Sequence, residues 1–177
     1  SNLVKTCVHS VFQHDISNVH GDVYAYVSEW LSEVCSNKNL PYVPHMVNLP
    51  KIDEDLRDVL NIPKDCIVFG RYGGYETFDI PFVYHVIENI LQSRKDIYFL
   101  FCNTRKFIDH PKVIFINGTS SLENKSKFIN TCDALLHARY QGESFGLTVA
   151  EFMQFNKPIF TYSNSPERNH YCLIGEH

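Results

Sequence analysis

The sequence predicts an α/β fold in which a parallel sheet is covered by helices on both faces. Between residues 66 and 162, short apolar runs alternate with segments whose apolar residues recur at helical spacing. The short runs are apolar throughout, which is typical of strands buried on both sides. Because strands that alternate with helices form parallel sheets, we expect a Rossmann-like unit that binds ligands at the carboxyl ends of its strands.

The expected elements follow one another in a regular order. Asp79 is placed to cap a helix that has Pro81 in its first turn and ends near Arg94. Ser120 and Glu123 have the spacing of a capping box, which opens the next helix. The expected strands are residues 66–69, 97–102, 113–116, 134–137 and 158–162, and a further helix begins near residue 147.

The first 65 residues are less regular. Residues 23–27 have the pattern of a strand, and residues 29–34 have that of a helical stretch. Three prolines between residues 41 and 50 indicate a linker. A short helix is expected over residues 53–60, just after these prolines.

Length, charge and cysteine spacing narrow the functional classes. The 177 residues are enough for a real core. A formal charge of −4 and the lack of a Lys/Arg stripe argue against a general nucleic-acid binder. No apolar run approaches the roughly 18 residues that span a bilayer. The six cysteines are widely spread without zinc-type spacing, so we expect reduced thiols in a cytoplasmic protein and no metal site.

Two acidic residues, Glu143 and Glu151, flank a glycine-containing turn and the start of an apolar helix. The helix has almost no polar face, so we expect it to be buried all round. A carboxylate at position 151 would then be buried, which is costly unless another group pairs with it. A structural ion pair and a ligand-binding carboxylate both satisfy this requirement.

The turn from Gly142 to Gly146 favours an anionic ligand. Both glycines permit positive φ and a close approach of the backbone. The N–H groups of residues 144–147 lie at a helix N-terminus, where free donors and the helix dipole favour a phosphate. A nucleotide sugar matches this pattern, since it has a diphosphate between two sets of hydroxyl groups.

The segment that begins at Glu143 resembles the Glu-x7-Glu signature of retaining glycosyltransferases with the GT-B fold, most closely glycosyltransferase family 4. The resemblance implies that Glu143 contacts the donor sugar, as a catalytic residue, and that Glu151 contacts the ribose. The matching positions are Glu143, Phe145-Gly146-Leu147, Ala150-Glu151, Met153 and Lys157-Pro158.

The resemblance also implies a domain organisation. Residues 1–40 would be a remnant of the N-terminal acceptor domain, and residues 41–65 an interdomain linker with a short helix. Residues 66–177 would be the Rossmann-like domain that binds the nucleotide-sugar donor, incomplete at its C-terminal end. Family members are about twice as long, so we expect a partial enzyme that covers most of the donor half.

Arg71 follows the first expected strand of that domain and precedes Gly73 and Gly74. Its fork geometry suits phosphate oxygens, and we expect it to act as a second catalytic group. In the family, a Lys usually follows five residues later and also contacts the diphosphate. This chain has Glu76 at that position, which departs from the family pattern. A surface Arg in a glycine-rich turn is the alternative interpretation.

The remaining candidates fall at the carboxyl ends of the other expected strands. Arg139 would reach the diphosphate or pair with one of the two glutamates. The resemblance places the nucleotide base against backbone groups of residues 117–119. The full set of expected donor-binding residues is Gly70, Arg71, Gly73, Gly74, Asn103, Asn117, Gly118, Thr119, Arg139, Gly142, Glu143, Ser144, Phe145, Gly146, Leu147 and Glu151.

These features lead to one function and two alternatives. We expect a retaining hexosyl-type glycosyltransferase that is metal-independent, has no cofactor and uses a UDP- or GDP-linked sugar. Its acceptor would be a glycan, a lipid or a protein, and the missing domain would allow peripheral membrane contact. The alternatives are a nucleotide-sugar-binding module without activity and a structural α/β domain whose glutamates are ion-paired in the core.

Overall fold

The computed structural model describes residues 4–13 and 21–175. Its contacts divide the chain into two compact units. One unit combines residues 1–46 with 141–147 and 165–177, and the other combines residues 47–140 with 148–164. Each unit is therefore assembled from segments that lie far apart in the sequence.

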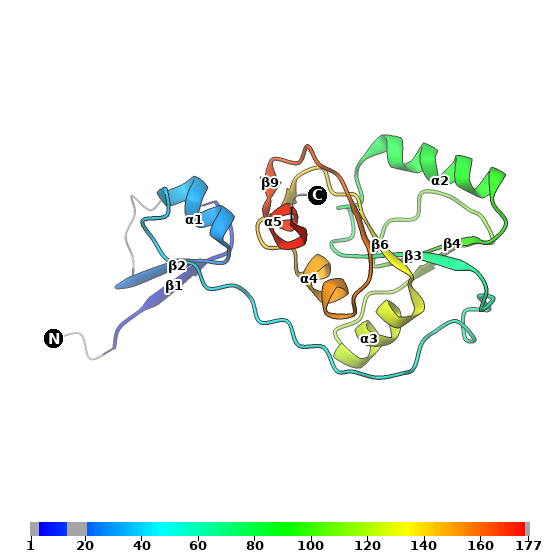
Figure 1. Cartoon of the computed structure of the whole chain (residues 1–177), viewed down its shortest axis with the longest axis horizontal. Helices are drawn as coiled ribbons and strands as arrows, with labels where there is room; N and C mark the ends of the chain where they lie inside the picture. Colours follow the sequence, from blue (N-terminus) through cyan, green and yellow to red (C-terminus); the bar gives the residue numbers. More distant parts are fainter. Residues whose placement is uncertain (1–3, 14–20, 176–177) are drawn as a thin grey trace. The chain divides into compact units, whose positions relative to one another are not determined.

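The unit formed by residues 47–140 and 148–164 contains a five-stranded sheet in the order β5-β4-β3-β6-β8 (Figure 1). All four pairs of neighbouring strands are parallel, as the sequence predicts. Strand β3 lies at the centre of the sheet, between β4 and β6. The strands are β3 (Ile67–Tyr72), β4 (Ile97–Cys102), β5 (Val113–Ile116), β6 (Ala134–His137) and β8 (Ile159–Thr161).

Helices cover both faces of this sheet (Figure 1). Helix α2 (Pro81–Ser93) packs on one face, where Ile87 joins Phe99 and Phe101 in the core. The helices α3 (Leu122–Thr131) and α4 (Leu147–Gln154) belong to the other face. Residues along a strand alternate between faces, so β3 and β4 contribute side chains to both cores. This arrangement confirms the predicted fold class.

A glycine in β3 sets the distance between the sheet and α3. A Cβ atom built on Gly70 would lie 2.1 Å from Cys132 Sγ and 3.3 Å from the ring of Phe128. Both neighbours are buried, so neither has free space to move into. The packing of α3 on the sheet therefore requires glycine at this position.

Strand β3 extends beyond the predicted end at residue 69. Arg71 and Tyr72 pair with Phe101 and Cys102 of β4, so the pairing continues past Gly70. The two residues after the glycine are thus strand residues and not part of a turn. Because they are adjacent in a strand, their side chains point to opposite faces of the sheet.

Both predicted helix caps differ from the observed caps by one residue. Ile80 occupies the N-cap of α2 without a side-chain hydrogen bond, and Asp79 instead accepts a hydrogen bond from the backbone N–H of Tyr140 at 2.7 Å. In α3 the cap is Ser121, which accepts from the N–H of Asn124, and not Ser120. A tertiary contact therefore replaces the local cap at residue 79.

The predicted short helix over residues 53–60 is wrong, since this segment forms a single turn at its end. The N–H of Leu60 bonds to the carbonyl of Leu56, and Asn61 then takes a positive φ of 54°. The turn is held to the sheet unit by Arg57, whose guanidinium lies 2.9 Å from the carboxylate of Asp133. The position of this segment is therefore set by the ion pair between Arg57 and Asp133, and no helix forms.

Helix α4 begins at Leu147, as the sequence predicts, but it is not buried all round. Val149, Glu151 and Phe152 are buried, whereas Leu147 and Met153 are exposed. The helix therefore has a buried stripe, and the carboxylate lies within it. No helix in the described part of the chain has the length and apolar character needed to cross a membrane.

The other unit is built from short elements. Parallel strands β1 and β2 pair with each other, and helix α1 is capped by Ser28, which accepts from the N–H of Leu31. Helix α5 contacts α1, and β7 pairs with β9 in parallel. The elements are β1 (Cys7–Ser10), β2 (Val23–Tyr26), α1 (Glu29–Ser36), β7 (Gly142–Glu143), β9 (Glu167–Arg168) and α5 (Asn169–Ile174).

Candidate functional site

The carboxyl end of β3 lies at the centre of the sheet, with β4 and β5 on one side and the later strands β6 and β8 on the other. Such a switch point is the usual ligand-binding position in open α/β sheets. Arg71 and Tyr72 are the last two residues of β3 and face opposite sides. Two separate groups of polar side chains result.

Glu151 is the centre of the group on the face covered by α3 and α4. The residue is only 5% exposed, as the apolar pattern of its helix predicts. The hydroxyl of Tyr72 donates a short hydrogen bond to one carboxylate oxygen of Glu151. Lys125, from the second turn of α3, lies 2.9 Å from the other oxygen. Each carboxylate oxygen thus has a partner, which offsets the cost of burial.

Lys125 and Tyr72 also make aromatic contacts. The ammonium of Lys125 lies 5.6 Å from the ring centre of Tyr72, within the range of a cation–π interaction. The ring of Tyr72 also contacts Phe128 edge-on and Phe152 at an angle. Apolar contacts therefore fix the position of the hydroxyl group that Glu151 accepts from.

Burial raises the pKa of Tyr72 far above its usual value, and the negative charge of Glu151 raises it further. The phenol consequently stays protonated at every physiological pH and remains a hydrogen-bond donor. In this arrangement Tyr72 and Lys125 both donate, and Glu151 accepts. The predicted contact of this carboxylate with a ribose stays a prediction.

Arg71 is the centre of the group on the opposite face, where it is 4% exposed. One terminal nitrogen donates to the hydroxyl of Thr104 at 2.5 Å and to the carbonyl of Asn103 at 3.3 Å. The other donates to the carbonyl of Gly74 at 2.9 Å and to the hydroxyl of Thr77 at 2.7 Å. The guanidinium thus joins the loop after β3 to the loop after β4. Its predicted contact with a diphosphate stays a prediction.

The glycines after β3 accommodate this arginine. A Cβ on Gly73 would lie 3.1 Å from the Arg71 guanidinium, and a Cβ on Gly74 would lie 2.9 Å from the Thr77 methyl group. Glu76, which stands where the family usually has Lys, is exposed and lies 4.0 Å from Arg105. The loop is therefore shaped by contacts within the protein, and its negative charge at residue 76 faces a cation.

The predicted base-binding loop follows β5. Asn117 and Gly118 are exposed, and a Cβ on Gly118 would lie 3.2 Å from the side chain of Asn103. Thr119 accepts a hydrogen bond from the N–H of Ser121 at the start of α3. Arg139 is partly buried two residues after the end of β6. These predicted residues all lie at the carboxyl edge of the sheet.

The rest of the predicted site, Gly142 to Leu147, belongs to the other compact unit. Gly142 and Gly146 both have positive φ, at 76° and 94°, as the turn pattern predicts. A Cβ on Gly142 would lie 1.9 Å from the carbonyl oxygen of Glu167 in β9, so the close backbone approach is to the chain itself. The predicted roles of Glu143 and its neighbours toward a ligand stay predictions.

Within that unit, three side chains hold the turn. Ser28 donates to the carbonyl of Ser144 at 2.6 Å, and Asn169 donates to the carbonyl of Phe145 at 2.7 Å. The ring of Phe145 meets the ring of His45 edge-on, with 5.1 Å between the ring centres. The backbone of the turn is therefore fixed by hydrogen bonds to its carbonyl groups.

Tyr72 and Lys125 are the two polar partners of Glu151 that sequence reasoning missed. The sequence places Tyr72 beyond the expected end of the strand at residue 69 and Lys125 among several charged residues of the expected helix. Tyr72 lies on the same face of β3 as Gly70, against which α3 packs, but this follows only from the extension of the strand past the glycine. Nothing in the sequence distinguished Lys125 from its neighbours.

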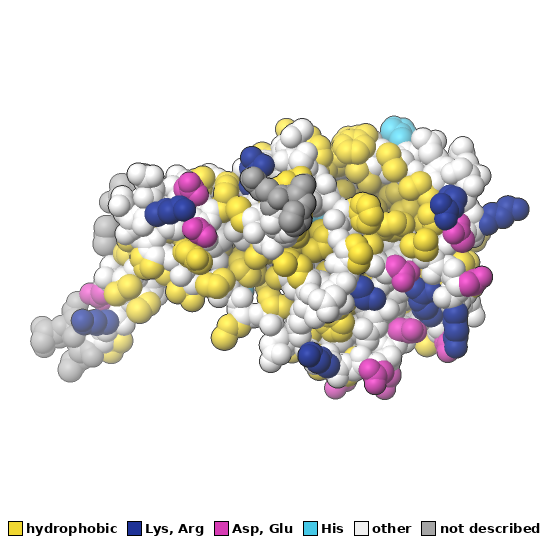
Figure 2. Space-filling model, in the orientation of Figure 1, with side chains coloured by type: hydrophobic (Ala, Val, Ile, Leu, Met, Phe, Trp, Pro, Cys, Tyr) yellow, Lys and Arg dark blue, Asp and Glu magenta, His cyan; other side chains and the backbone are white. Residues whose placement is uncertain are grey.

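The described residues contain no group of three or more His, Cys, Asp or Glu side chains placed to hold a metal ion. Asp53 and Asp55 have Asp-x-Asp spacing, but Asp55 accepts a hydrogen bond from the N–H of Arg57 in the linker. On the face drawn in Figure 2, Lys and Arg side chains lie among Asp and Glu. That face carries no continuous basic patch.

Comparison with known proteins reveals a common fold. No protein-family model matches the sequence, and no curated protein matches it. Solved structures do match. HepE of Anabaena, solved in complex with UDP-glucose, has a TM-score of 0.67 at 13% sequence identity. The match covers 92% of this chain and 49% of the HepE chain. A glycosyltransferase from Rickettsia africae has a TM-score of 0.60 at 14% sequence identity. That match covers 78% of this chain and 44% of the Rickettsia chain.

A further match is WaaG, a glycosyltransferase involved in lipopolysaccharide biosynthesis, with a TM-score of 0.54 at 16% identity. It is covered over 47% of its length, and 85% of this chain is aligned. The chain thus spans less than half the length of these three proteins. Its parallel sheet with flanking helices has the fold of the Rossmann-like C-terminal domain of GT-B glycosyltransferases.

Proposed function

We propose that this chain binds a nucleoside-diphosphate sugar and forms the donor half of a glycosyltransferase that retains the anomeric configuration. The observation that carries the proposal is the buried carboxylate of Glu151, held by Tyr72 and Lys125 next to the carboxyl end of β3. A purely structural ion pair needs no such position at the switch point of the sheet. The shared fold with HepE, which was solved with UDP-glucose, supports the same ligand class.

In this proposal Glu151 accepts hydrogen bonds from the ribose hydroxyl groups. Hydrogen bonds to a charged acceptor are stronger than those to a neutral one, so a ligand that lacks the hydroxyl should bind more weakly. Glu143 contacts the donor sugar, as the resemblance to family 4 implies. Both roles are specific enough to be tested by single substitutions.

Arg71 and Arg139 are the proposed sources of positive charge for the leaving diphosphate. Electrostatic stabilisation by fixed donors is a large catalytic contribution in such reactions and requires no metal ion. The reaction proposed here is accordingly metal-independent, with no cofactor besides the sugar donor. We place the protein in the cytoplasm, with a glycan, a lipid or a protein as acceptor.

Calorimetric titration with UDP, GDP and ADP, with and without EDTA, tests this function. We expect one nucleotide to bind saturably and EDTA to leave its affinity unchanged. Glu151→Gln should lower that affinity about tenfold, because a charged acceptor is replaced by a neutral one. Glu88→Gln, on the exposed surface of α2, is the matched control and should bind as the wild type does. Equal affinity in Glu151→Gln, or no binding of any nucleotide, would contradict the proposal.

A further inference from the structure

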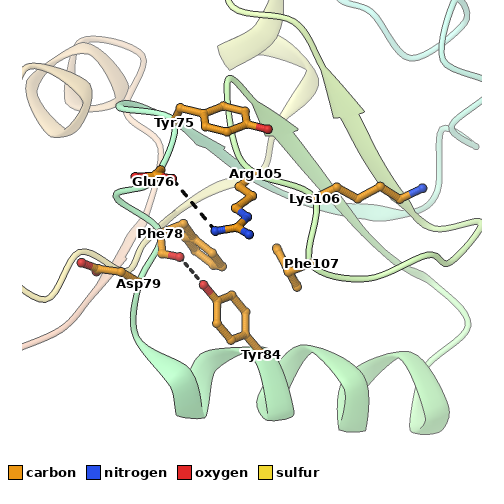
Figure 3. A pocket seen from close by; sticks show the side chains of 8 residues that line it. All are labelled: Tyr75, Glu76, Phe78, Asp79, Tyr84, Arg105, Lys106 and Phe107. Carbon is orange, nitrogen blue, oxygen red and sulfur yellow. Dashed lines mark hydrogen bonds and ion pairs between the residues drawn. The ribbon is translucent and has the colours of Figure 1, made fainter.

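A pocket of about 480 Å³ lies on the face of the sheet opposite to Glu151, between the loop after β3 and the loop after β4 (Figure 3). It is at the carboxyl ends of neighbouring parallel strands, where α/β sheets bind ligands. Its volume is typical of sites for small molecules. The residues that line it are Tyr75, Glu76, Phe78, Asp79, Tyr84, Arg105, Lys106 and Phe107.

The two loops that form the pocket are fixed to each other without a ligand. Arg71 donates to Gly74 in one loop and to Thr104 in the other. The side-chain amide of Asn103 donates to the carbonyl of Gly73 at 2.8 Å, and the N–H of Arg105 donates to the carbonyl of Tyr75 at 3.0 Å. A ligand would therefore meet preformed walls, which reduces the ordering cost of binding.

The floor of the pocket is aromatic. The rings of Phe78 and Phe107 stack with 5.6 Å between their centres, and Tyr84 lies 4.6 Å from Phe107. The hydroxyl of Tyr84 donates to the carbonyl of Phe78, so this phenol is turned into the floor. Tyr75 stands at the rim and is 55% exposed. Tyr75, Tyr84 and Phe107 offer flat apolar surface to a ligand, while the buried Phe78 supports them from below.

The rim carries two acids and two bases, and each base lies beside an acid. Glu76 lies 4.0 Å from Arg105, and both side chains are largely exposed. Asp79 accepts from the N–H of Tyr140, and Lys106 pairs with Asp109 at 2.8 Å. Figure 3 shows Arg105 extending between Tyr75 and Phe107. A phosphate would meet the carboxylate of Glu76, and an organic cation would meet the guanidinium of Arg105. The balance therefore favours a neutral ligand with many hydroxyl groups.

We propose that this pocket binds a neutral saccharide. The hydroxyl groups of a sugar ring donate to carboxylates and accept from guanidinium and ammonium groups, while its C–H face packs on aromatic rings. Carboxylates, cations and aromatic rings are the three features that the pocket combines. If the proposed function holds, the saccharide is a sugar unit of the acceptor, and Glu76 serves acceptor binding at the position where the family usually has Lys.

Saturation-transfer NMR of the full chain tests this inference, with the methyl glycosides of glucose, galactose, mannose and N-acetylglucosamine as probes. At least one probe should bind. Tyr75→Ala and Glu76→Gln should each weaken that binding about tenfold, through lost ring contact and lost charged acceptor. Phe82→Ala, equally exposed on α2, and Glu88→Gln are the matched controls and should bind as the wild type does.

Three results would overturn the inference: no binding of any probe, unchanged binding in both pocket variants, or displacement of the saccharide by UDP. Displacement would place the sugar in the nucleotide site and not in this pocket. Saccharide binding in a chain that binds no nucleotide would uphold the pocket and contradict the proposed function. The two proposals therefore fail separately.

Discussion

At the scale of single residues, Glu151 depends on two donors from different elements. Tyr72 supplies a hydroxyl from the end of β3, and Lys125 supplies an ammonium from α3. Taking a carboxylate out of water costs several kcal/mol, and removal of one partner leaves that cost uncompensated. The stability of this part of the protein is thus coupled to the candidate binding residue.

Lys125→Met tests that coupling. The variant keeps the apolar stem but removes the cation next to a carboxylate that is almost fully buried. We expect the free energy of unfolding to fall by about 2 kcal/mol, below the full cost of breaking a buried pair because Lys125 is 26% exposed. Chemical denaturation monitored by circular dichroism measures the change.

Lys127→Met is the matched control for this experiment. Lys127 lies two residues further along α3, is 29% exposed and pairs with Glu54, which is itself exposed. An exposed pair contributes little, so this variant should unfold close to the wild type. Adding Glu151→Leu to Lys125→Met should restore part of the lost stability, because both charges are then absent. Equal effects of the two lysine substitutions would show that Glu151 does not depend on Lys125.

His45 makes the unit that contains Phe145 sensitive to pH. Burial lowers the pKa of His45 from 6.5, and the neighbouring His9 lowers it further. Because the folded chain takes up this proton less readily than the unfolded chain does, acidification below 6.5 favours unfolding. The contribution is fully present above that pH and is lost progressively below it.

Thermal unfolding at about pH 7.5 and about pH 5.5 measures this dependence. His45→Phe retains an aromatic edge against Phe145, 5.1 Å away in the wild type, but cannot be protonated. The wild type should lose more stability on acidification than the variant does. An identical loss in both proteins would exclude His45 as the source.

At the scale of elements, β3 and α3 pack closely at Gly70, and a substitution there tests this contact. Gly70→Ala would place a methyl group 2.1 Å from Cys132 Sγ, in a region without free space. We expect destabilisation of about 1–3 kcal/mol from overpacking. Chemical denaturation measures it, with Cys132→Ala and the double variant completing a cycle.

The cycle separates overpacking from other effects of the substitution. Removal of Cys132 Sγ provides room for the new methyl group, so the double variant should be more stable than the sum of the single changes predicts. Additive effects would show that Gly70 is required for another reason. Such a result would favour the predicted role of Gly70 in donor binding over its role in packing.

The sequence predicted the strands well and the helix ends less well. Strands β4, β5 and β6 have their predicted bounds, because buried parallel strands are apolar runs with clear ends. The cap at Asp79 and the helix at residues 53–60 were wrong, because long-range contacts of Asp79 and Arg57 replace local structure there. Local patterns do not contain such contacts.

The candidate site was predictable only in part for the same reason. The burial of Glu151 followed from the apolar composition of its helix, and the structure confirms it. Its partners could not be predicted, because they depend on which strand residue and which turn of α3 face α4. The direction of Tyr72 follows from the extension of β3 past Gly70, which composition alone does not reveal.

At the scale of the whole molecule, each compact unit combines segments that are separated in the sequence. Residues 141–147 and 165–177 group with residues 1–46, although they flank helix α4 and strand β8 of the sheet unit. The Glu-x7-Glu segment is therefore divided, with Glu143 in one unit and Glu151 in the other. The predicted domain bounds of 1–40, 41–65 and 66–177 stay predictions.

Glu151 belongs to the sheet unit alone. Glu151 has both described partners within the sheet unit, so its role can be measured there directly. The central claim is that Glu151 accepts hydrogen bonds from a ribose. A comparison of nucleotides that differ only in one ribose hydroxyl addresses this claim without reference to the other unit.

The most direct measurement compares calorimetric binding of UDP with 2′-deoxy-UDP, and of the GDP and ADP pairs, to wild type and Glu151→Gln. If Glu151 accepts a hydrogen bond from the ribose, the wild type binds the ribonucleotide about tenfold more tightly than the deoxyribonucleotide. This difference in affinity largely disappears in the variant. An equal preference in both proteins, or no preference in the wild type, would contradict the assignment of Glu151 to the ribose.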